Sequence, residues 1–279
     1  ALTRAFLLSK VGTQTAKTVL SPATHGRNIM GNVILLGANG YNPFTVGKER
    51  GALETVKKRL RGYSDEEFGK YVGRLQELGI VDSSVKAQTV KKIASEAFNF
   101  EPRGRVDKLS RTWAGKATKK TFELYQAEDD IFKIIHFQKT MDDMKKWDLG
   151  LSNDALEEMA AARTRDLMPN YALVPKSVKW LRRSPLSDFA AWPSEITRVS
   201  KNLLKYSFDD VTGKTADKLR KQGFDISDKA AESIRDQGYR RTASLVTASM
   251  AGDALQNYSM NMMGLGQEDV YNINRLSPS

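Results

Sequence analysis

The feature that most constrains the fold is the spacing of the apolar residues, which recur at three and four positions far more often than at two. This is the period of an α-helix with one buried face, and few segments alternate as a half-buried strand would. One stretch has both ends marked, because Ser64 and Glu67 form a capping-box pair and Gly79 follows as a stop signal. The sequence therefore predicts an all-α fold, an irregular multi-helix assembly of helical hairpins and long amphipathic helices.

The same period predicts four further helices. A segment of about residues 85–98 pairs with the helix that starts at Ser64 into a hairpin, and the longest uninterrupted pattern covers about residues 116–147. Another apolar face extends over residues 189–206, where Pro193 either kinks the helix or begins a new one. A helix rich in Met and small residues is expected over about residues 240–263.

Glycines are expected to shape two more regions. The run over residues 29–40 predicts a buried helix with close packing at its glycines. Residues 216–224 are similar to residues 231–239, and each copy is interpreted as a helix stopped by its glycine, Gly223 or Gly238. Two copies are too few for a solenoid, which needs about three repeats to bury a continuous core.

Positive charge is concentrated near the beginning of the chain. The net charge is +11, and residues 1–62 hold 10 basic and 2 acidic residues. We divide the sequence into a basic N-terminal helical region (1–62), a hairpin with a long helix (63–150) and a C-terminal helical region (151–279). The first residue is not Met, and we expect the whole to be a segment of a larger protein. A local excess of Lys and Arg indicates contact with a polyanion such as DNA, without reading of its sequence.

The candidate contacts form one dense group and three cations before it. The expected nucleic-acid contacts are Lys10, Lys17, Arg27, Lys57, Lys58, Arg59 and Arg61. Few aromatic residues lie near them, so base stacking is not indicated at this place. The alternative is that the last four cations stabilise the end of a helix, which requires no ligand.

Asp130 stands out because it shares a helical stripe with apolar residues. The stripe steps from Asp130 through Ile134, Phe137, Met141 and Met144 by four, three, four and three positions. A buried carboxylate needs a partner, so we expect Asp130 to form a buried pair with an arginine. The candidates are Arg27 and Arg198; the alternative is a position at the rim of the core.

The sequence contains no recognisable catalytic or metal site. There is no Cys, and His25 and His136 are the two histidines, without the spacing of a zinc site. Gly213, Lys214 and Thr215 end like a phosphate-binding loop, but Phe208 stands where that motif requires glycine. We therefore expect no enzyme activity within this segment, no metal and no cofactor.

Three stretches resemble the internal virion proteins, also called core or ejection proteins, of short-tailed bacteriophages and related large multi-domain phage virion proteins. The similar residues lie in Ser9 to Asn32, with Arg27-Asn28-Ile29-Met30-Gly31-Asn32; in Tyr125 to Phe137, with Ala127-Glu128-Asp129-Asp130; and in Pro169 to Asn202, with Trp192-Pro193-Ser194-Glu195-Ile196 and Arg198. The resemblance implies a helical protein in the virion interior that leaves with the genome and reaches the host cell envelope. It also implies homo-oligomeric assembly, other virion core or portal proteins as partners, and membrane contact during ejection.

Two alternatives remain open from the sequence. The segment could be a non-catalytic part of a phage enzyme, such as a virion RNA polymerase or a peptidoglycan-cleaving transglycosylase. It could also be a cellular helical adaptor. A converging polar cleft would favour the first alternative, and a gene among host genes would favour the second.

Overall fold

The described part of the chain is helical. The computed structural model describes residues 31–44, 51–82, 87, 90, 119–170 and 191–262, with side chains except at 57, 119–127, 191–193 and 248–262. All regular secondary structure within these residues is helical, which confirms the all-α prediction. Besides a helical stretch over residues 31–38, the helices are α3 (Ala52–Arg61), α4 (Asp65–Glu77), α7 (Lys119–Lys146), α8 (Asn153–Leu167), α10 (Ala191–Val211), α11 (Lys214–Lys221) and α12 (Asp228–Met262).

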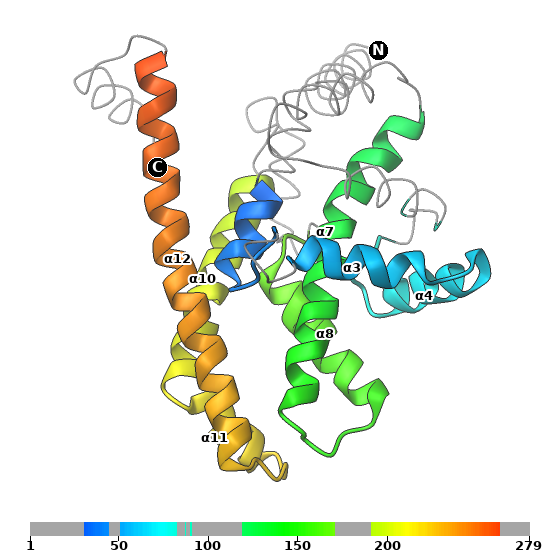
Figure 1. Ribbon diagram of the computed structural model, residues 1–279, viewed down its shortest axis with the longest axis vertical. Helices are drawn as coiled ribbons and strands as arrows, with labels where there is room; N and C mark the ends of the chain where they lie inside the picture. The colour runs from blue at the N-terminus through cyan, green and yellow to red at the C-terminus, as the bar shows by residue number, and fades with distance from the viewer. Residues whose placement is uncertain are drawn as a thin grey trace, which may run out of the picture.

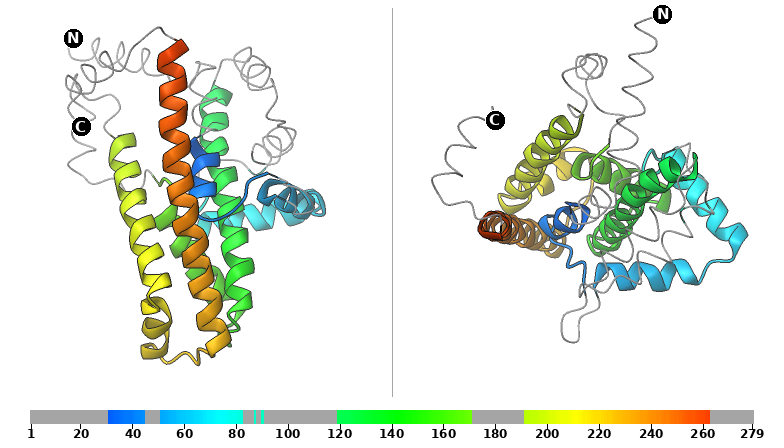
Figure 2. Two further views of the ribbon diagram at one scale, coloured as in Figure 1. Left: turned by 60° about the vertical axis from the view of Figure 1, so that its left-hand side comes forward. Right: turned by 90° about the horizontal axis from the view of Figure 1, so that it is seen from above.

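Two long helical pairs build the body (Figures 1 and 2). Helices α10 and α12 lie side by side and antiparallel, joined at one end through α11, and α7 and α8 form the second pair. The helical stretch over residues 31–38 lies between the two pairs, while α3 and α4 extend to one side of α7. Helix α8 also packs on α10, so the two pairs share one interior.

Helix α4 has the ends that its sequence predicts. The hydroxyl of Ser64 accepts a hydrogen bond from the Glu67 N–H, and the Glu67 carboxylate accepts one from the Ser64 N–H at 2.8 Å. Just beyond the helix, Gly79 has a φ of +68°, which favours glycine. The interior face follows the apolar spacing, since Phe68 and Leu75 are buried. Residues close in sequence are thus enough to set both ends and the buried face of α4.

Helix α7 carries the predicted buried stripe. Asp130, Ile134, Phe137, Met141 and Met144 are all 9% exposed or less. Their side chains belong to a large apolar core that also receives residues from α3, α4, α8 and α12. The predicted stripe is confirmed, and it places a carboxylate inside this core.

The stretch over residues 31–38 is buried as predicted, but not through its glycines. Val33 and Leu36 are buried, whereas a Cβ added at Gly31 or Gly37 would have no neighbour within 4 Å. The close approach occurs instead at Gly40, where φ is +81° and an added Cβ would lie 3.3 Å from the Arg241 backbone nitrogen. The predicted glycine packing is therefore wrong for the helix and applies to the turn after it.

The two similar segments around Gly223 and Gly238 differ in structure. Gly223 ends the turn after α11 with a φ of +94°, as predicted. Gly238 lies inside α12, so the prediction of a second stop is wrong. A Cβ there would lie 2.8 Å from both the Asp210 Cβ and the Val211 nitrogen, and glycine therefore lets α10 and α12 approach closely. Tertiary packing outweighs the usual cost of glycine within a helix, about 1 kcal/mol.

Pro193 is the third residue of α10 as this helix is described, Ala191–Val211. Of the predicted helix over residues 85–98, only Ala87 and Val90 are described; both are helical, and Val90 is buried. The predicted start of the long helix at about residue 116 and the loop after residue 263 lie outside the described residues.

Candidate functional site

The predicted basic cluster is only partly described, and its described side chains differ in their partners. Lys58 and Arg61 at the end of α3 are exposed. Arg59 instead forms a salt bridge with Asp142 of α7 at 3.1 Å and donates to the Gln138 side chain at 3.3 Å. Lys10, Lys17 and Arg27, and the side chain of Lys57, lie outside the described residues. Arg59 thus links α3 to α7 through a partly exposed salt bridge, and its contact with nucleic acid stays a prediction.

Asp130 is buried, as expected, at 1% exposed, but its partner is a lysine. Lys133, one helical turn away, lies 2.9 Å from the Asp130 carboxylate, which also accepts the Asp82 N–H at 3.2 Å. Burial raises the pKa of Asp130, and the neighbouring Lys133 opposes that rise. The predicted pairing with Arg198 is wrong, while Arg27 lies outside the described residues.

Arg198 has a different carboxylate partner. Its guanidinium binds both oxygens of the buried Glu195 at 2.8 to 3.2 Å, on the same helix. It also donates to the carbonyl oxygens of Asp166 and Met168 at the end of α8. Arg198 therefore caps α8 from α10, at the helix end where positive charge is favourable.

The most buried charged cluster was not predicted from the sequence. Asp210 of α10 is 0% exposed and binds two arginines through one oxygen: Arg163 of α8, and Arg241 of α12 at 2.7 Å. Its other oxygen accepts the Thr215 hydroxyl at 2.6 Å. We call these four residues the Asp210 node. It joins α8, α10, α11 and α12 at one carboxylate.

The Asp210 node carries more positive than negative charge. Arg163 gains contact with the rings of Trp147 at 5.5 Å and Tyr206 at 4.8 Å, measured from its Cζ to the ring centroids. Such contacts stabilise a desolvated cation by about 1 to 2 kcal/mol. The Nε atoms of Arg163 and Arg241 have no hydrogen-bond partner among the described residues, so Asp210 is their main compensation.

Neutral polar groups extend from this node into the α7 side of the core. The Tyr41 hydroxyl lies 3.1 Å from Thr140 Oγ1 and accepts from Gln237 at 3.2 Å, and Gln237 also donates to Asp143. Burial, with Asp143 nearby, raises the pKa of Tyr41 to about 12. His136 packs edge-on against Tyr41, and its Nδ1 lies 3.0 Å from the Thr164 hydroxyl.

His136 is neutral at ordinary pH. Burial, together with the positive charges of Arg241 and Arg163, lowers its pKa from 6.5 to about 3. A group that titrates so low is not a general base near pH 7. His136 therefore serves as a neutral hydrogen-bonding group of the core. No group of three His, Cys, Asp or Glu side chains able to hold a metal occurs among the described residues.

The resemblance of Gly213, Lys214 and Thr215 to a phosphate loop has a structural explanation. Gly213, with a φ of +79°, forms the turn between α10 and α11. Thr215 is bound to Asp210, and the Lys214 ammonium lies 4.6 Å from the centroid of the Phe208 ring. A helix precedes the glycine where the phosphate-binding motif requires a strand.

The outer side of the α10–α12 hairpin exposes large apolar side chains. Leu204 and Phe208 on α10 are 63% and 57% exposed, and Tyr239 and Val246 on α12 are 55% and 57% exposed. Within each helix the two residues are separated by four or seven positions and so share a side. We call this set of four the outer stripe.

The crossing at Gly238 fixes the register of the outer stripe. Gly238 lies against Asp210 and Val211, and the helices are antiparallel. Positions before Asp210 on α10 therefore lie beside positions after Gly238 on α12. Phe208 and Tyr239 lie at nearly one level, and Leu204 and Val246 lie further along the hairpin.

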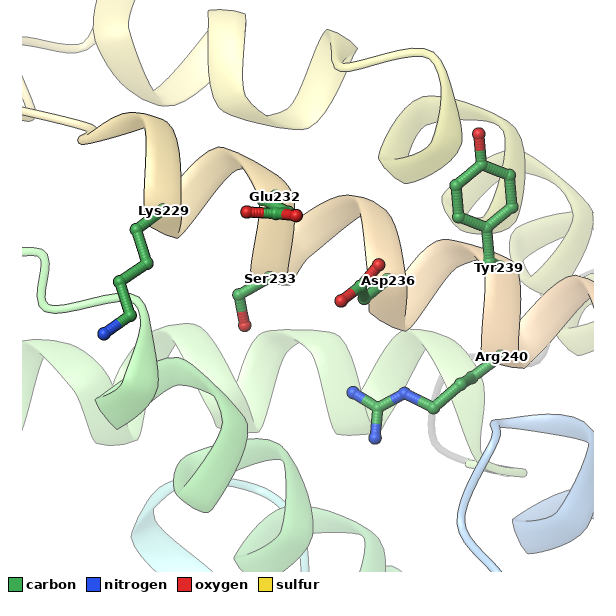
Figure 3. A pocket seen from close by; sticks show the side chains of 6 residues that line it. All are labelled: Lys229, Glu232, Ser233, Asp236, Tyr239 and Arg240. Carbon is green, nitrogen blue, oxygen red and sulfur yellow. The ribbon is translucent and has the colours of Figure 1, made fainter.

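A hollow of about 610 Å³ lies beside this stripe, along α12 (Figure 3). Its lining residues are Lys229, Glu232, Ser233, Asp236, Tyr239 and Arg240. Figure 3 shows Tyr239 and Arg240 leaving α12 on opposite sides, so Tyr239 belongs to the edge of the hollow. The lining mixes both signs of charge and contains no pair of groups arranged as nucleophile and base.

No helix among the described residues is both long and apolar enough to cross a membrane. Comparison of the chain with protein-family models, with curated proteins and with solved structures gives no match.

Proposed function

We propose that this chain is a structural segment of an internal core or ejection protein of a short-tailed phage, which assembles as a homo-oligomer and contacts DNA or the genome-exit conduit. Catalysis is not part of the proposed role of this segment. The observation that carries the proposal is the outer side of the α10–α12 hairpin, where cations without a salt-bridge partner among the described residues accompany exposed apolar residues.

The cations on this side are available to an external anion. Lys201 and Lys205 are exposed next to Leu204, and Arg235 is exposed one helical turn before Tyr239. None of the three forms a salt bridge with a described carboxylate. Cations that are not internally compensated can neutralise phosphates and release their counterions, which favours binding without sequence preference.

The Asp210 node supports this role from the inside of the hairpin. It holds α8, α10, α11 and α12 at one buried carboxylate. A contact surface made by two helices keeps its spacing only if those helices are fixed to each other. The phage context of the proposal comes from the three stretches that resemble phage virion proteins, the third of which includes most of α10.

DNA contact is tested with the full chain and two labelled duplexes of unrelated sequence. We expect equal affinities that fall steeply with salt, and we expect Lys201→Gln with Lys205→Gln to reduce the log–log salt slope by about 1.8. Lys70→Gln is the matched control, because Lys70 is an exposed lysine on α4 already paired with Glu66 at 2.7 Å. Binding that is independent of salt, or no binding to these duplexes or to single-stranded DNA, would refute DNA contact.

Assembly is tested separately by sedimentation of the full chain over a wide concentration range. We expect a closed homo-oligomer, with interfaces above about 1,000 Å² between neighbours. A monomer at every concentration, and isolated copies in a reconstruction of the particle, would refute the assembly part while leaving DNA contact to its own experiment.

A further inference from the structure

The outer stripe contains two aromatic rings that stay more than half exposed. Phe208 and Tyr239 are 57% and 55% exposed and lie at nearly one level on neighbouring helices. Leaving large rings in water is unfavourable, at about 25 cal/mol for each Å² of apolar surface. A partner with flat apolar faces would remove that cost.

Positive charge lies beside both rings. Lys214 holds its ammonium 4.6 Å from the Phe208 ring centroid, and Arg235 precedes Tyr239 by four positions on α12. Lys201 and Lys205 continue this charge along α10 beside Leu204. Rings interleaved with cations match a ligand that offers planar faces and negative charge together.

We infer that the outer stripe binds single-stranded nucleic acid, with bases stacked on Phe208 and Tyr239 and phosphates held by Lys201, Lys205 and Arg235. The inference rests on the proposed DNA contact and deepens it by naming the strand state and the residues. The site is distinct from the basic cluster at the end of α3, where aromatic residues are few.

The strand state follows from what each ligand offers to the rings. In a duplex the bases are paired and stacked on each other, so exposed rings beside a duplex would face sugar and phosphate. In a single strand the base faces are open, and stacking on a protein ring stabilises each base irrespective of its identity. Exposed rings beside lysines therefore favour the single strand.

Carboxylates limit the site at one end and argue against an anionic membrane. Glu232 and Asp236 are exposed on α12, in the turns before Tyr239. A flat anionic bilayer that reached all four apolar residues of the outer stripe would also approach these two carboxylates. A narrow strand can instead start at Arg235 and extend over Tyr239 and Phe208 and along α10, so that the rest of its length leads away from the two carboxylates.

The test uses the full chain, a labelled oligothymidylate and a duplex of equal length. We expect tighter binding of the oligothymidylate, and Phe208→Leu and Tyr239→Leu should each weaken it by about fivefold or more, because leucine keeps apolar bulk but removes the stacking ring. Tyr239→Phe should retain binding. Lys201→Gln with Lys205→Gln should lower the salt slope by about 1.4, whereas Lys70→Gln should leave it unchanged.

Each result decides the inference. Duplex bound as tightly as the single strand, or leucine variants that bind like the parent, would overturn it and leave the proposed DNA contact intact. If neither nucleic acid binds, both proposals fail. Preferential binding to vesicles of phosphatidylglycerol and phosphatidylcholine would assign the stripe to a membrane, and an oligomer dissociated by Leu204→Glu without nucleic-acid binding would assign it to a second copy. Thermal unfolding by circular dichroism confirms that each variant is folded.

Discussion

Replacing the buried carboxylate at the centre of the α10–α12 hairpin gives the strongest test of the fold. Asp210→Asn keeps the size of the side chain but removes the charge that compensates Arg163 and Arg241. Breaking one buried ion pair costs about 3 to 5 kcal/mol, because an uncompensated charge stays in the core. Here one substitution leaves two guanidinium groups at 5% and 1% exposed, so we expect at least that loss.

The loss is measured by urea and thermal unfolding. For domains of roughly 150 to 250 residues each kcal/mol lowers Tm by about 2 to 4 °C, so Asp210→Asn should lower Tm by roughly 6 to 20 °C. Asp217→Asn is the matched control, because Asp217 also pairs with an arginine, Arg220 at 3.6 Å, but is 62% exposed. Its expected effect is within about 0.5 kcal/mol.

A second substitution tests whether the lost stability comes from the uncompensated arginines. Adding Arg241→Met to Asp210→Asn removes one of the two stranded cations, so part of the lost stability should return, with a coupling free energy of about 1 to 3 kcal/mol. If Asp210→Asn costs no more than Asp217→Asn, or if the two substitutions are simply additive, the account of Asp210 as the shared counter-charge is refuted.

Three further predictions concern single positions. The pKa of His136 is about 3 in the folded chain and 6.5 in the unfolded chain, so between these pH values only the unfolded chain binds the extra proton, and the folded state loses stability as pH falls. The free energy of unfolding should be roughly 2 kcal/mol lower at pH 5 than at pH 7. An unchanged pH dependence in His136→Asn would contradict this. Gly238→Ala should lower the free energy of unfolding by about 1 to 3 kcal/mol, because its Cβ would lie 2.8 Å from α10, whereas Gly69→Ala has open space around it and should raise that free energy by about 0.5 to 1 kcal/mol. Urea unfolding in which both variants change stability in the same direction would contradict the assigned contacts. Asp130→Ala should cost about 3 to 5 kcal/mol in the same assay, because it removes the buried carboxylate that pairs with Lys133 and accepts the Asp82 N–H, and a loss below about 1 kcal/mol would contradict the burial of this pair.

Features governed by neighbouring residues could be predicted from the sequence. The capping box at Ser64, the stop at Gly79 and the buried stripe that starts at Asp130 each depend on positions a few residues apart. The partner of Asp130 could have been predicted in the same way, since Lys133 lies three positions along the helix, where side chains meet. Lys133 binds the Asp130 carboxylate on the same helix, so no arginine from a distant segment is needed.

Features governed by tertiary packing could not be predicted so directly. The apolar stripe of α10 includes Val199 and Leu203, and one more step of seven reaches Asp210, so its burial could have been found. Nothing in the sequence pairs it with Arg163 and Arg241, which come from two other helices. Gly223 and Gly238 stand in similar local sequences, yet one ends a turn and the other allows a helix crossing, because only the second lies against α10.

The buried node and the outer stripe are two sides of one helical crossing. Asp210 faces inward two positions after Phe208 on α10, and Tyr239 follows Gly238 directly on α12. The contact that brings Gly238 against Asp210 therefore also sets Phe208 and Tyr239 at one level on the outside. A side chain at position 238 would separate the two rings as well as the two helices, so the spacing of the proposed binding surface depends on the same glycine that allows the buried arginine of α12 to reach its carboxylate.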